Sequence, residues 1–141
     1  MRRLRVRAQV DPPPEIVAFA RRHGAGSLAF LPTREGPLIP FLMRLHDGLP
    51  EGGVAVVADV VWQTAPTPDL IRAFAPAPGR EKVRPIEGWE MQAEHAGLAI
   101  VERLDVPSSS WAPLATPEQR AALAGDARGA AKLAAWALRR A

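Results

Sequence analysis

The stretch Leu49–Thr64, LPEGGVAVVADVVWQT, decides the fold that this sequence predicts. A helical pattern ends at its Pro-Glu-Gly-Gly turn, and the run Val54–Val61 that follows is almost wholly apolar, without alternation. Such a strand is covered on both faces, which is typical of the interior of a parallel or mixed sheet with helices on each side. We expect Asp59 and Trp62 to lie together just past the carboxyl end of this strand, where open α/β sheets bind their ligands.

The sequence on either side of this strand predicts further strands and helices from the spacing of its apolar residues. Before it, we predict a strand with one solvent-facing side at Leu4–Val10, a helix at Glu15–His23, a strand at Ser27–Leu31 and a helix at Pro37–Leu49. After it, we predict a short helix at Asp69–Phe74, a helix at Pro85–Ala96, a strand at Leu98–Val106 and a last helix from Thr116 to Ala141, which Gly125 and Gly129 could divide. This order predicts an α/β fold, a three-layer sandwich with a mixed, mostly parallel sheet.

The composition is that of an ordinary globular chain. Its 141 residues, 48% of them apolar, suffice for a hydrophobic core, and we predict a single domain over residues 1–141. No apolar run reaches the ~18 residues of a transmembrane helix, and the N-terminus lacks the apolar stretch of a signal peptide. Cys is absent, which excludes disulfides and thiolate metal sites, and no two His residues have metal-ligand spacing. We therefore predict no metal, no membrane partner and a cytoplasmic location.

Basic residues crowd the start of a chain whose formal net charge is +3. Arg2, Arg3, Arg5 and Arg7 could contact phosphates. They could instead form a solvated edge or a frayed terminus. We favour this second interpretation because no aromatic residues interleave with them, as a nucleic-acid platform requires. The sequence therefore predicts that the protein does not bind nucleic acid.

Three stretches resemble class I S-adenosylmethionine-dependent methyltransferases. Val10–Glu15 (VDPPPE) is similar to the end of the family's second strand and the start of the helix that follows. Phe41–Trp62 (FLMRLHDGLPEGGVAVVADVVW) is similar to a helix, a Pro-Gly-Gly-type turn and the fifth strand, with Glu51 standing between the proline and the glycines. Ile86–Trp111 (IEGWEMQAEHAGLAIVERLDVPSSSW) is similar to a helix, an Ala-Gly break and the sixth strand. The resemblance implies a Rossmann-like methyltransferase fold.

Three residues are candidates for the site. The resemblance implies that Asp11 binds the ribose hydroxyls of S-adenosylmethionine. The place of Asp59 and Trp62 at the carboxyl end of a central strand predicts that Trp62 stacks on a small-molecule substrate that Asp59 orients or deprotonates. From the residues alone, Asp11 could instead be a turn residue before a run of prolines, Asp59 could cap a loop and Trp62 could cover the core. The sequence identifies no catalytic residue, since a methyltransferase that aligns its reactants well can work with a single base or with none.

The chain departs from the family at its start. The family's opening strand and its glycine-rich GxGxG turn should precede Val6, where this sequence has only five residues. That turn lets the backbone approach the methionine part of the cofactor. Two hypotheses follow. One is a methyltransferase-like protein that acts on a small molecule, and the other is a non-catalytic, degenerate form of that fold that serves as a binding module or as a homodimerisation module through an exposed sheet edge.

Overall fold

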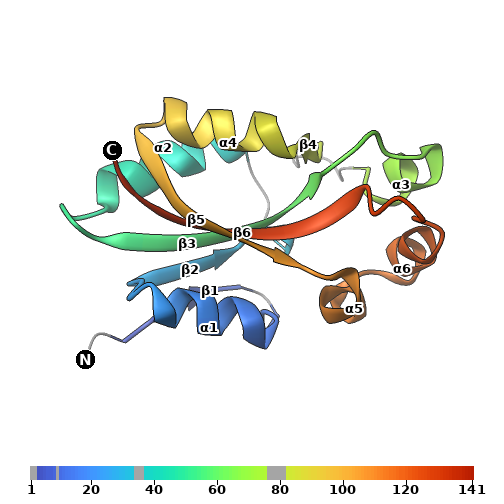
Figure 1. Ribbon diagram of the computed structural model, residues 1–141, viewed down its shortest axis with the longest axis horizontal. Coiled ribbons are helices and arrows are strands. Elements are labelled where there is room, and N and C mark those ends of the chain that lie inside the picture. Colours follow the sequence, from blue (N-terminus) through green and yellow to red (C-terminus); the bar gives the residue numbers. More distant parts are fainter. Residues whose placement is uncertain (1–2, 9, 34–36, 76–81) are drawn as a thin grey trace.

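The computed structural model describes residues 3–8, 10–33, 37–75 and 82–141. Its strands form one six-stranded sheet in the order β1-β2-β3-β6-β5, with β4 paired to β3 (Figure 1). The strands are β1 (Arg5–Arg7), β2 (Ser27–Phe30), β3 (Val54–Trp62), β4 (Arg84–Pro85), β5 (Leu98–Val106) and β6 (Ala131–Arg140). The helices are α1 (Pro14–Arg22), α2 (Leu38–Gly48), α3 (Pro68–Ala73), α4 (Ile86–His95), α5 (Ser108–Trp111) and α6 (Pro117–Ala124), with 3-10 helices η1 (Leu31–Thr33) and η2 (Ala112–Leu114).

The sheet is mixed. β1, β2, β3 and β4 pair in parallel, whereas β6 lies antiparallel to both β3 and β5. Figure 1 shows α1 and α5 on one side of the sheet and α2 and α4 on the other. The predicted three-layer α/β sandwich with a mixed, mostly parallel sheet is therefore confirmed.

Strand β3 is buried on both faces, as its lack of alternation predicted. Val56 and Ala58 pack in the core on the α1 side, while Ala55 and Val57 pack in the core under α2 and α4. All four side chains are fully buried. Because side chains alternate along a strand, the even-numbered residues of β3 face α1 and the odd-numbered residues face α4.

The segment Ala131–Arg140 is a strand, β6, where the sequence predicted the second part of a long helix. The helix α6 begins with a capping box, in which the Thr116 hydroxyl accepts from the Gln119 backbone N–H and the Gln119 side chain accepts from the Thr116 backbone N–H. It ends, however, at Ala124. Gly129, with a φ of 63°, then turns the chain into β6.

Burial within the sheet explains this difference. Alanine is the strongest helix former, yet β6 lies between β3 and β5 and is covered on both faces. Leu133 and Ala135 face the α1 side, while Trp136 and Leu138 face α2 and α4. A continuous apolar run fits a buried helix and a buried strand equally well, so its sequence pattern could not distinguish the two.

The other predicted helices and strands exist, with ends shifted by a few residues. The strand predicted at Leu4–Val10 is only the short β1, and its residue 9 lies outside the described residues. The sequence did not predict β4 or α5. Within the described ranges, no helix combines the length and the apolar character needed to cross a membrane.

The crossover from β1 to β2 has an unusual hand. The chain runs from β2 through α2 to β3 and later from β3 through α4 to β5. Both connections advance in the same direction across the sheet, and both helices cover the same face. The β1–α1–β2 unit advances in that direction too, but α1 covers the opposite face. Its hand is therefore opposite to that of the other two, although crossovers between parallel strands are nearly always of one hand. β1 is thus the atypical element of this sheet.

Candidate functional site

The carboxyl ends of β1, β2 and β3 meet at one edge of the sheet, called here the carboxyl edge. Figure 1 shows α3, α5 and α6 at this edge. Ligands of open α/β sheets bind outside the carboxyl ends of the strands. Asp11 follows β1, and Asp59 and Trp62 belong to β3, so all three predicted residues lie on segments that reach this edge.

Asp59 lies within β3, not past its end as predicted, and pairs with Ala134 of β6. Its Oδ2 accepts a hydrogen bond from Trp89 Nε1 at 3.0 Å, and its Oδ1 accepts from the Val60 backbone N–H at 2.8 Å. The carboxylate therefore satisfies the indole N–H of Trp89, which is itself almost fully buried in the core under α4.

Trp62 is the last residue of β3 and faces the opposite side of the sheet from Asp59. Its ring meets that of Phe74 edge to face, with centroids 5.9 Å apart and planes at 86°. Phe74 in turn contacts Trp111, with centroids 6.2 Å apart. The sequence placed Asp59 and Trp62 side by side, but the two-residue period of a strand separates them and joins Trp62 to an aromatic cluster of Trp62, Phe74 and Trp111.

Trp111 is the buried member of this aromatic cluster. Only 3% of its surface is exposed, and its Nε1 has no hydrogen-bond acceptor within the described part of the chain. A buried N–H without an acceptor costs about 1–3 kcal/mol. A ligand oxygen placed next to this indole would remove that cost. The cluster thus combines two half-buried rings, Trp62 and Phe74, with a buried ring whose N–H is unpaired among the described residues.

The start of α1 contacts the helix that carries Trp111. A hydrogen bond from the Ser110 hydroxyl, the main cause, holds the pKa of Glu15 below its ordinary value. Ser110 of α5 therefore lies near the first turn of α1. Asp11, which is exposed in the loop before α1, therefore lies on a segment that leads directly to the aromatic cluster.

Sequence reasoning did not find the contributions of Phe74 and Ser110. Phe74 follows a short surface helix, and Ser110 belongs to a serine run without a nucleophile motif. The only available signal was the scarcity of aromatic residues, since the chain has four Trp, four Phe and no Tyr. Three of those eight rings meet at the carboxyl edge.

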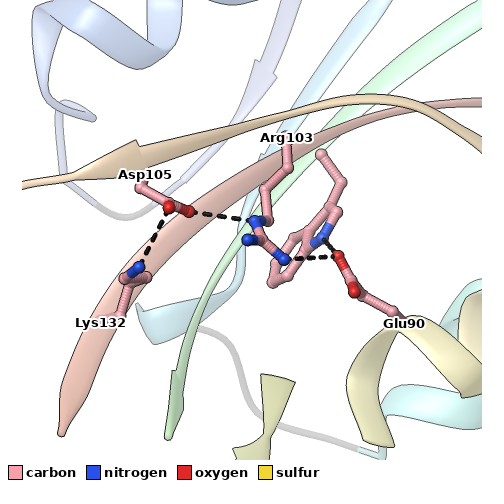
Figure 2. A network of polar contacts seen from close by, with 5 residues as sticks. Glu90, Arg103, Asp105 and Lys132 are labelled. Carbon is pink, nitrogen blue, oxygen red and sulfur yellow. Dashed lines mark hydrogen bonds and ion pairs between the residues drawn. The ribbon is translucent and has the colours of Figure 1, made fainter. Parts of the chain in front are cut away.

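A network of charged side chains lies on the other face of the sheet (Figure 2). Arg103 bridges Glu90 Oε2 at 3.0 Å and Asp105 Oδ1 at 3.1 Å, and Lys132 Nζ contacts Asp105 Oδ2 at 3.0 Å. Because opposite charges alternate through it, the network links α4 to β5 and β6. Among the residues that the structure describes, no three His, Cys, Asp or Glu side chains gather into a group that could hold a metal ion.

Comparison with solved structures supports the fold assignment. No family model matches the sequence, and no curated protein is significantly similar to it. The fold is similar to that of geranyl diphosphate C-methyltransferase from Streptomyces coelicolor A3(2), with a TM-score of 0.64 and 15% identity over 82% of this chain and 46% of that one. It is also similar to a SAM-dependent methyltransferase from Thiobacillus denitrificans, with a TM-score of 0.57, 13% identity, and coverage of 82% and 57%.

The chain therefore has a class I S-adenosylmethionine-dependent methyltransferase-like fold. A cyclopropane synthase from Mycobacterium tuberculosis gives a TM-score of 0.54 at 16% identity, over 79% of this chain and 54% of that one. The chain spans about half the length of these structures. The Streptomyces coelicolor and Thiobacillus denitrificans proteins were crystallised with S-adenosyl-L-homocysteine, and the former also with geranyl diphosphate and Mg²⁺.

The segment between β1 and α1 fits only part of S-adenosylmethionine. Asp11 presents an exposed carboxylate with no hydrogen bond to other described residues, and such a group can accept from two ribose hydroxyls. The same segment contains Pro12 and Pro13, with Pro14 opening α1, but no glycine. Because proline lacks a backbone N–H, this segment cannot supply the row of N–H donors that a glycine turn gives. It fits the ribose and does not fit the methionine part of the cofactor.

Proposed function

We propose that this protein is an S-adenosylmethionine-dependent methyltransferase-like protein that acts on a small molecule at the carboxyl edge. The observation that carries the proposal is the aromatic cluster of Trp62, Phe74 and Trp111, with its buried indole N–H, on a methyltransferase-like sheet. Flat apolar walls with a few convergent polar groups are the usual composition of a small-molecule site.

Each predicted residue has a distinct part in this proposal. The Asp11 carboxylate accepts hydrogen bonds from the ribose of the cofactor, and the Trp62 ring packs on the substrate. The Trp111 Nε1–H donates to an oxygen of the bound molecule. The prediction that Asp59 orients the substrate stays a prediction. Its carboxylate is already bonded to Trp89, so Asp11 and Trp62 are the sharper test positions.

Calorimetric titration with S-adenosylhomocysteine tests the proposal. We expect a dissociation constant in the micromolar range, which corresponds to about −8 kcal/mol. The Asp11→Ala variant should lose this binding, while Glu94→Ala, which removes an exposed acid on α4, should retain it. Absence of heat at about millimolar ligand would remove the methyltransferase proposal for this chain.

The second candidate is a non-catalytic binding or homodimerisation module of the same fold. It is favoured by the proline-rich segment after β1 and by β1 itself, an edge strand whose three residues are all exposed. An unpaired edge offers backbone groups to another chain. In this case sedimentation velocity should show a dimer, and S-adenosylhomocysteine should leave both the mass and the melting temperature unchanged.

A further inference from the structure

A cleft lies at the opposite end of the sheet from the carboxyl edge. It has a volume of about 440 Å³ and opens between β1, the C-terminal half of α2 and the amino ends of β2 and β3, where Gly26 and Gly53 line it. This volume is within the range of small-molecule pockets, which is about 300–1,000 Å³. The cleft is thus separate from the site proposed for the cofactor.

Four arginines line this cleft, namely Arg3, Arg5, Arg7 and Arg44. Arg7 pairs with Ala29, whose side chain belongs to the core under α2, so Arg7 and its alternate neighbour Arg5 point to the α2 face. Arg44 reaches the same cleft from α2. Two elements far apart in the sequence therefore direct guanidinium groups at one concave surface. Arg2 lies outside the described residues.

The charges of these arginines are not balanced within the described ranges. Among the described residues, no Asp or Glu lines the cleft and none of the four arginines forms an ion pair. Other arginines are paired, since Arg22 binds Glu102. The nearby Asp47 carboxylate contacts His46 instead. Four like charges on one concave surface repel one another and attract an anion.

The rest of the lining is apolar. Phe41 and Leu45 of α2 and Leu49 after it contribute one wall, and Phe41 and Leu49 are almost fully buried. A ligand that fits this cleft therefore has an anionic group for the arginines and a body with apolar or ring surface for the wall. Guanidinium groups match phosphate oxygens in bidentate geometry, which favours phosphate over a simple carboxylate.

We propose that this cleft binds a small organic phosphate, with its phosphate or diphosphate group on Arg5, Arg7 and Arg44 and its ring or apolar body on the Phe41 wall. The concave shape favours a small ligand. A nucleic-acid strand would instead need a groove with several aromatic rings for base stacking, and Phe41 is the only aromatic residue among the described lining residues. An acidic protein segment on the β1 edge would not use the buried Phe41 wall.

Calorimetric titration of the full chain with ADP and with inorganic pyrophosphate tests the proposal. Both should bind, ADP more tightly because its nucleoside covers the apolar wall, and affinity should fall as salt rises. Arg5→Gln and Arg44→Gln should each weaken ADP binding about tenfold, because each removes a charge-assisted hydrogen bond. Arg21→Gln, an exposed arginine on α1 outside the cleft, should leave the affinity unchanged.

The variants should keep the melting temperature of the parent chain because all three side chains are exposed. Equal losses in Arg44→Gln and Arg21→Gln, or no binding at about millimolar ADP, would overturn the proposal. If the affinity for single-stranded oligonucleotides increased with their length, the proposal would be wrong and the cleft would be part of a nucleic-acid-binding surface. Binding of S-adenosylhomocysteine should be unaffected by Arg44→Gln, so this test is independent of the proposed methyltransferase function.

Discussion

The indole rings of Trp89 and Trp136 stack face to face, with centroids 3.8 Å apart and planes 7° from parallel. Trp89 comes from α4 and Trp136 from β6, and both are almost fully buried. Each indole N–H donates to its own carboxylate, Trp89 to Asp59 at 3.0 Å and Trp136 to Glu90 at 2.8 Å. The stack therefore joins helix to sheet with both of its polar atoms satisfied.

Replacing Trp136 by alanine should destabilise the protein by about 3–5 kcal/mol, because a large cavity opens beside Trp89. Urea unfolding measures this loss. A double-mutant cycle with Trp89→Leu isolates the stacking contribution, which we expect at about 0.5–1.5 kcal/mol. Trp62→Ala, at a half-buried ring of the aromatic cluster, serves as the comparison and should cost less. A coupling near zero would mean that the two rings are adjacent without stabilising each other.

Asp59→Ala should cost about 1–3 kcal/mol, because it leaves the buried Trp89 N–H without its acceptor. Asp59→Asn should cost less, since its amide oxygen can still accept one hydrogen bond. Glu94→Ala, which removes an exposed acid from α4, should change stability by no more than about 0.5 kcal/mol. If Asp59→Ala proved as stable as the parent chain, the hydrogen bond to Trp89 would not contribute to stability. The predicted role of Asp59 in binding the substrate would then be favoured.

The sequence predicted β3 correctly because its physical signal is local. An apolar run without alternation fits a buried strand or a buried helix, but the glycine turn before β3 and its many β-branched valines favour the strand, and the structure covers it on both faces. β6 has no such local signal. Its alanines favour a helix, and it becomes a strand because β3 and β5 each offer it an edge to pair with. The apolar periodicity within one segment does not show which distant segments it will pair with.

The candidate site shows the same limit. The sequence found Trp62 from its place at the end of a strand, and the structure keeps it at that edge. Its partners Phe74 and Trp111 come from α3's end and α5, and nothing in the spacing of those segments predicts that their rings meet. The error over Asp59 was different. It came from placing Asp59 past the end of a strand whose predicted range already contained it; within a strand, residues 59 and 62 point to opposite faces.

Ala135→Leu should destabilise the protein by about 1–3 kcal/mol, because Ala135 is fully buried where β6 passes between β3 and β5. The same change at Ala121, exposed on α6, should have almost no effect. Urea unfolding of both variants measures the difference. Equal stability of the two would contradict the placement of β6 in the middle of the sheet.

Glu102 of β5 fastens α1 to the sheet through a bidentate contact with Arg22, at 3.0 and 2.8 Å, and a contact with His23 Nε2 at 3.0 Å. The hydrogen bonds from Arg22 are the main cause that holds the pKa of Glu102 below its ordinary value of 4.5. A lowered pKa means that the folded protein holds the charged carboxylate more strongly than the unfolded chain does. The resulting stability is fully present above pH 4.5 and is lost as the pH falls through the folded-state pKa.

Glu102→Gln should therefore lower the melting temperature at neutral pH and have a diminishing effect in acid. Circular dichroism melts from about pH 7 to about pH 3 should show the two melting temperatures converging below the ordinary pKa, because the parent carboxylate is then protonated and resembles the amide. Glu94→Gln, at an exposed acid of α4 without a partner among the described residues, should give melting temperatures that run parallel to the parent's at every pH. A constant gap between Glu102→Gln and the parent down to the lowest pH would show that Arg22 does not hold this carboxylate in its charged form, and that α1 is fixed to the sheet by apolar packing alone.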